Sequence, residues 1–158
     1  MGILSFVTWL DGSALGQAIR DSRWLFPAIE ASHLLGLAVL GGCVLIVNMR
    51  LLGLGLRSQS TAEVARDVRP FMLSSLAVML VSGFLLFASE AIKCYEHTAF
   101  WFKMSCLALA IVAAFTIQNR AIQIEDRNSG TFQVKLVALI SVALWTGVGI
   151  GGRWIGFS

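Results

Sequence analysis

The chain has 158 residues, of which 57% are hydrophobic and 13% are charged, with a formal net charge of +3. This composition lies outside the usual balance of soluble domains and indicates a membrane protein. The basic residues are scattered near the ends of apolar segments, which argues against nucleic-acid binding. The three cysteines form neither a CxxC pair nor a CxxCH motif, so we expect no zinc knuckle and no covalently attached c-type haem.

Residues 3–20 mix apolar side chains with charged ones, a pattern typical of a short amphipathic helix that lies in the membrane interface without crossing it. Four continuous apolar runs follow, each near the roughly 20 residues that a helix needs to cross hydrocarbon. A β-barrel would instead need many short alternating segments. The sequence therefore predicts an all-α fold, an integral membrane four-helix bundle, as one domain over residues 1–158. The predicted spans are residues 26–54, 71–95, 99–122 and 132–155.

The connections between the spans carry local signals. Ser60-Thr61 followed by Glu63 predicts a helix start, and Pro70 predicts the opening of the next helix. Asn128-Ser129-Gly130 predicts a turn between the third and fourth spans. In the fourth span, Gly147-x-x-x-Gly151 would let another helix approach closely, either from the same chain or from a second copy.

Lysine and arginine counts predict the orientation, because cytoplasmic connections carry an excess of them. Seven lie on the side of the 1–2 and 3–4 connections and five on the other side. We therefore expect a multi-pass protein of the bacterial inner membrane with both termini in the periplasm. The first group comprises Arg50, Arg57, Arg66, Arg69, Arg120, Arg127 and Lys135, and the second comprises Arg20, Arg23, Lys93, Lys103 and Arg153.

Ionisable side chains inside a membrane span are costly unless they are paired or ligated, which makes Glu30 and His33 candidate site residues. At 100° per residue, Glu30, Gly41 and Asn48 point in nearly one direction, with His33 on its flank. This spacing predicts an inward-facing polar stripe on the first span. A neutral imidazole that is only hydrogen-bonded is the alternative reading of His33.

His97 is the one other histidine, and helix order places it on the same side of the membrane as His33. An imidazole in an apolar bundle with cations at its edge is typical of a b-type haem, whose propionates the cations meet. We expect His33 and His97 to ligate one or two haems b per chain, with Glu30 beside them. A solvated loop histidine beside Glu96 is the alternative reading of His97. Candidate propionate partners are Arg23, Lys103 and Arg153. Candidates to line the macrocycle are Trp101, Trp145 and Phe100. Tryptophans at the membrane interface and snorkelling cations also occur in proteins without a cofactor.

The two histidines differ in predicted depth. His33 lies roughly 9 Å into its helix beyond Pro27, whereas His97 precedes the third apolar run. Either the third helix begins before His97 and carries it into the membrane, or each histidine serves a separate haem.

Four short elements in order, Glu30-x-x-His33-x-x-Gly36, Arg50-Leu51-Leu52-Gly53, Phe102-Lys103 and Gly152-Arg153-Trp154-Ile155, resemble a bacterial family of small four-helix membrane proteins without an assigned function. That family looks related to dihaem b-type cytochromes. The resemblance extends from about Arg23 to Phe157 and implies haem b near one membrane face and a homotrimeric assembly. The chain departs from the family pattern at Asn48, where an acidic residue is usual.

The sequence therefore predicts a membrane b-type cytochrome that transfers electrons near the periplasmic face, rather than an enzyme with its own substrate. With both histidines on one side, exchange with a quinone or a periplasmic redox protein is expected. Two other classes stay open. A copper-handling protein would use the histidines with Cys94 and scattered methionines, and an assembly or transport subunit would use Glu30 and His33 as a proton or structural pair.

Overall fold

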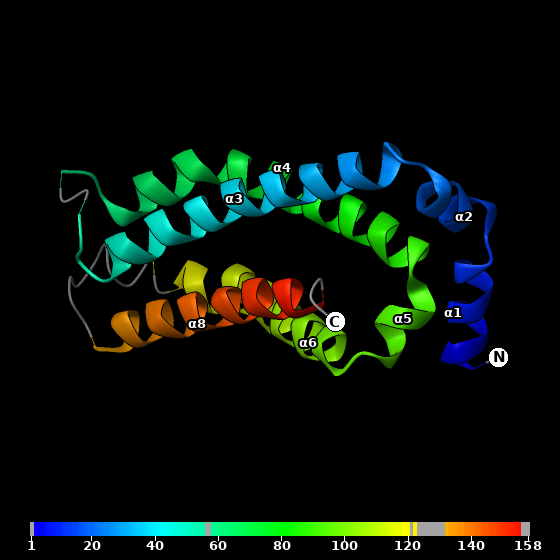
Figure 1. The fold of residues 1–158 in the computed structure, drawn as a ribbon. Helices are drawn as coiled ribbons and strands as arrows, with labels where there is room; N and C mark the ends of the chain where they lie inside the picture. Colours follow the sequence, from blue (N-terminus) through cyan, green and yellow to red (C-terminus); the bar gives the residue numbers. More distant parts are fainter. Residues whose placement is uncertain (1, 56–57, 121, 123–131, 156–158) are drawn as a thin grey trace.

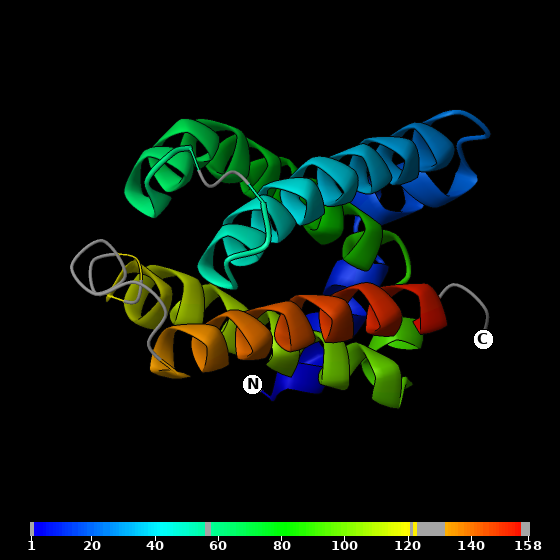
Figure 2. The ribbon, with the colours of Figure 1, turned by 90° about the vertical axis from the view of Figure 1, so that its left-hand side faces the viewer.

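Four long apolar helices run side by side as two pairs, which form separate layers (Figures 1 and 2). Helix α3 (Leu25–Leu51) packs along α4 (Thr61–Ser89), and α6 (Thr98–Ala113) packs along α8 (Phe132–Ile155). Contacts between α3 and α8 join the pairs, whereas α4 and α6 scarcely touch within the described part of the chain. The structure is a computed structural model that describes residues 2–55, 58–120, 122 and 132–155.

Three short helices gather at one end of the bundle (Figure 1). These are α1 (Ile3–Asp11), α2 (Ala14–Asp21) and α5 (Ala91–Glu96). They lie where α3 and α6 begin and where α4 and α8 end. We call this the α5 end of the bundle.

The helix boundaries follow from local chemistry. The predicted start at Ser60 is confirmed, because its side chain accepts from the Glu63 N–H while the Glu63 carboxylate accepts from the Ser60 N–H. At the end of α3, Gly53 adopts φ 78°, which lets the Leu54 N–H bond to Met49 O at 2.8 Å. This left-handed closure favours glycine because a Cβ would be strained there.

The packing is that of a membrane protein, with small clusters between the helices and large apolar side chains on the outside. One cluster joins α3 and α8 away from the α5 end, and a second joins α3 and α4 at mid-height with Trp145 against it. Exposed leucines and phenylalanines cover the outer faces of all four long helices. Because each of these helices is long and apolar enough to span a bilayer, the predicted all-α four-span fold is confirmed.

Several predicted boundaries differ from the structure. The amphipathic segment 3–20 forms two helices instead of one, because Gly12 and Ser13 end α1 and cap α2. Pro70 does not open a helix but lies inside α4, which runs on from Thr61. Residues 91–95, predicted to end the second span, belong to the separate helix α5.

The third span also differs, because after Ala113 it continues as the π-helix η1 (Ala114–Gln118). The predicted turn at Asn128-Ser129-Gly130 lies outside the described residues, as do Arg57 and Arg127.

Candidate functional site

His33 lies on the inner face of α3, half-buried, and its ring is held by α4. Its Nδ1 is 2.8 Å from Ser82 Oγ, and the Ser82 hydroxyl donates its proton to Val78 O at 2.5 Å. A serine hydroxyl has one proton to give, so Ser82 Oγ accepts from Nδ1–H of His33. The neutral imidazole therefore carries its lone pair on Nε2, which has no hydrogen-bond partner among the described residues.

Gly83, the next residue of α4, makes room for this ring. A Cβ at Gly83 would lie 3.2 Å from His33 Cε1, tighter than ordinary van der Waals contact. Ser82 thus orients the imidazole, and Gly83 lets the ring lie close to the α4 backbone. Neither residue was among the predicted site residues.

Lys103 of α6 is half-buried. Its side chain passes over two glycines of α8, where Cβ atoms at Gly151 and Gly152 would lie 3.1 Å from its Cβ and 3.3 Å from its Nζ. The ammonium is within electrostatic range of the His33 imidazole, and it forms no ion pair within the described ranges. The predicted close approach at Gly147 and Gly151 is therefore made by α6 of the same chain.

Cys94 of α5 lies within electrostatic range of the Lys103 ammonium. Burial raises the pKa of the Cys94 thiol above its ordinary value, and the nearby Glu90 carboxylate raises it further, while Lys103 opposes both. The thiol is therefore protonated at neutral pH and is a poor nucleophile and metal ligand in this state.

His97 occupies different surroundings. It is the N-cap residue of α6, so the third span begins after His97 and not before it. Its Nδ1 is buried and has no hydrogen-bond partner among the described residues. It borders a mostly apolar groove of about 530 Å³ that Phe102 and Trp154 also line.

The predicted polar stripe of α3 is only partly correct. His33 and Asn48 face the interior, and Asn48 is 0% exposed with its amide bonded to Val44 O and Ser141 Oγ. Glu30 and Gly41 are exposed instead. The reason is that the buried side of α3 is centred about a quarter of a turn away from Glu30.

The aromatic and cationic candidates are dispersed. Trp101 ties α6 to α5, because its Nε1 donates to Tyr95 O at 3.0 Å. Trp145 packs in the mid-height cluster, and its Nε1 is buried without a partner within the described part of the chain. Phe100 stacks on Phe87 with ring centroids 5.2 Å apart. Arg23 is exposed just before α3, and Arg153 is exposed near the end of α8.

One functional contact at the α5 end was not predicted. Arg20 of α2 donates to Asp11 Oδ2 at 3.2 Å and to the buried Ser89 carbonyl at 3.0 Å. Asp11 Oδ1 in turn accepts from the Ile92 N–H at 3.3 Å. These bonds fasten the two N-terminal helices to the junction between α4 and α5.

The described residues contain no group of three His, Cys, Asp or Glu side chains that could hold a bare metal ion. The site instead offers one oriented imidazole, one half-buried cation and glycines against which both side chains pack closely. A lone imidazole with an open Nε2 suits a metal that brings its own equatorial ligands, as the iron of a haem does.

Fold and site together define a small helical membrane protein with four spans and one oriented histidine in its interior. The chain belongs to the family of unknown function DUF6644, which it matches over residues 6–158. Comparisons with curated proteins and with solved structures gave no match.

Proposed function

We propose that this protein is a membrane b-type cytochrome in which His33 ligates the iron of a haem b. The observation that carries the proposal is the hydrogen bond between His33 Nδ1 and Ser82 Oγ, together with the bond from Ser82 to Val78 O. Ser82 holds Nδ1–H, so Nε2 presents the lone pair that an axial ligand needs. The sequence resemblance to relatives of dihaem b-type cytochromes points the same way.

The neighbouring residues support a charged amphiphilic cofactor at this place. The Lys103 ammonium, without an ion-pair partner among the described residues, suits a propionate. The orphaned Nε1–H of Trp145 is a further buried donor in the bundle. Haem b, when bound, supplies a one-electron couple at its iron. The residues of the chain orient that iron, balance the propionate charge and exclude water.

A second haem at His97 is part of the proposal. Its buried, unpartnered Nδ1 and the adjoining apolar groove of about 530 Å³ support it. We infer that His33 and His97 serve separate haems, because their surroundings differ. Both lie toward the α5 end, which we propose faces the periplasm of a bacterial inner membrane. Electrons would then be exchanged with a quinone or a periplasmic redox protein. We also propose that the protein assembles as a homotrimer.

The test is an optical spectrum of the purified protein, oxidised and reduced, with a haem-to-protein ratio. We expect a Soret band and about two haems per chain, and loss of about one of them in His33→Ala. His97→Ala is the matched variant and should remove the other haem while His33 keeps its own. A spectrum without a Soret band, or one unchanged in His33→Ala, would overturn the proposal.

Metal analysis of the purified protein distinguishes the cytochrome from the two alternative classes of protein. Copper without iron would favour a copper-handling protein. A colourless, metal-free preparation that co-purifies with a defined partner would favour an assembly or transport subunit.

A further inference from the structure

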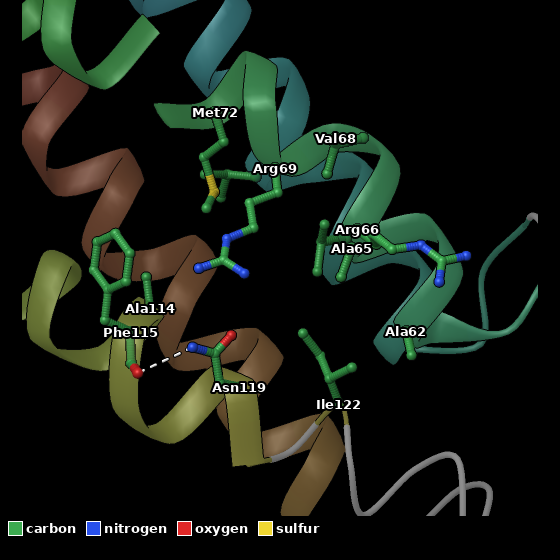
Figure 3. Close-up of a pocket in the computed structure, with 12 residues that line it drawn as sticks. Ala62, Ala65, Arg66, Val68, Arg69, Met72, Ala114, Phe115, Asn119 and Ile122 are labelled. Atoms are coloured by element: carbon green, nitrogen blue, oxygen red, sulfur yellow. Dashed lines mark hydrogen bonds between the residues drawn. The ribbon is translucent and has the colours of Figure 1, made fainter. Parts of the chain in front are cut away.

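A separate cavity lies away from the α5 end, between α4 and the π-helix η1 (Figure 3). Its volume is about 440 Å³, within the range of small-molecule sites. The space exists because α4 and α6 diverge here and because small side chains, Ala62, Ala65 and Ala114, face it. Met72, Phe115 and Ile122 add larger apolar side chains to the wall, and Arg66, Arg69 and Asn119 are its polar members.

Of the two arginines that line the cavity, Arg69 points across it. Figure 3 shows the Arg69 guanidinium extending from α4 toward Asn119 on the opposite wall, whereas the neighbouring Arg66 turns away. Within the described residues, no carboxylate lies within ion-pair distance of Arg69. Asn119 already donates its Nδ2 to Phe115 O at 3.0 Å. Arg69 therefore brings an unbalanced positive charge and several free donors to the cavity.

The depth of Arg69 matches the headgroup layer of a bilayer. Residues 71–89 of α4 carry no charge and cover about 28 Å as a helix, close to the roughly 30 Å of the hydrocarbon core. Arg69 then lies at the edge of this core, where lipid phosphates are found. The apolar part of the cavity, toward Met72 and Phe115, continues into the hydrocarbon.

We propose that this cavity binds one molecule of an anionic phospholipid, with its phosphate on Arg69 and part of an acyl chain against Met72 and Phe115. Charge decides the class of ligand. A phosphate oxygen pair matches the guanidinium in both charge and geometry. A neutral quinone offers only carbonyl acceptors and leaves the cation unbalanced. The proposal does not depend on haem binding, because the site is at the other end of the bundle and uses none of the same residues.

The experiment is a lipid titration of the purified full-length protein in detergent, followed by native mass spectrometry. The two probes are dioleoyl phosphatidylglycerol and dioleoyl phosphatidylcholine, which share acyl chains and differ in net charge. We expect one phosphatidylglycerol per chain to bind about tenfold more tightly than phosphatidylcholine, the effect of one charge-assisted contact. Arg69→Gln should remove this preference, and Arg69→Lys should keep most of it.

Lys135→Gln is the matched control, because Lys135 is an exposed cation at the same end of the bundle and lies outside the cavity. It should leave the preference unchanged. Equal binding of the two lipids by the wild-type protein, a measurement that needs no variant, would overturn the proposal. So would a preference that survives in Arg69→Gln, or saturable binding of decylubiquinone that phosphatidylglycerol does not displace.

Discussion

At the scale of single residues, the site depends on where one proton goes. A histidine inside an apolar helix stands out in the sequence because its burial is costly without a partner. The residue that bonds to this histidine cannot be recognised from the sequence. Serines in membrane helices usually bond to a carbonyl of their own helix, and Ser75, Ser82 and Ser105 all do so. Only the packing of α3 on α4 distinguishes Ser82, because it alone of the three faces an imidazole.

Ser82→Ala tests this role. Without the hydroxyl, nothing fixes the proton on Nδ1 of His33, so Nε2 is no longer held as the acceptor. We expect haem affinity to fall about tenfold or more, as is usual when the hydrogen-bond partner of a ligating histidine is removed. The measurement is a titration of the apoprotein with haem, followed at the Soret band.

Ser75→Ala provides the control for this variant. Ser75 is also a buried serine of α4, but it bonds only to carbonyls of its own helix, at Phe71 and Met72. It should leave haem affinity unchanged. Equal losses in both variants would show that Ser82 acts through the stability of α4 and not through His33.

At the scale of elements, the N-terminal helices show what the periodicity of apolar residues can predict and what it cannot. The mixture of apolar and charged residues in segment 3–20 correctly predicted helix, but not the break at Gly12 and Ser13 or the docking on α4. Docking depends on Gly16, which packs directly against the carbonyl of Ala88. It also depends on Arg20, whose bond to the Ser89 carbonyl joins segments far apart in the sequence. Helical periodicity reports which face is apolar and not what that face meets.

Gly16→Ala should therefore destabilise the α5 end. A Cβ at Gly16 would collide with the Ala88 carbonyl oxygen, and this backbone atom cannot move aside as a flexible side chain could. We expect a loss of about 1–3 kcal/mol, the usual cost of overpacking. Thermal unfolding in detergent measures it, together with faster hydrogen exchange in α1 and α2.

The matched substitution is Gly149→Ala, in the C-terminal third of α8. A Cβ there meets nothing within 4 Å, so alanine should be neutral or slightly stabilising through its higher helix propensity. If Gly16→Ala melted no earlier than Gly149→Ala, the close packing of α2 on α4 would be wrong.

At the scale of the whole molecule, the sequence predicted the four spans because apolar length is a local property. It did not predict the arrangement of the spans. The wide separation of α4 from α6, which creates the Arg69 cavity, follows from which pairs of helices pack closely. Gly151 illustrates the difference. The sequence indicated that some helix approaches it, and only the fold identifies Lys103 of α6 as the contact.

The orientation of the molecule is the last prediction, and it follows from the number of spans. Four crossings place both termini on one side together with the α5 end, and the excess of arginine at the opposite end favours the cytoplasm for that end. We expect alkaline phosphatase fused after residue 158 to be active, because this enzyme folds in the periplasm. Green fluorescent protein inserted between residues 127 and 128 should fluoresce, because that connection is then cytoplasmic. The reverse pattern would place His33 and His97 near the cytoplasmic face, and the redox partner would then have to be sought there.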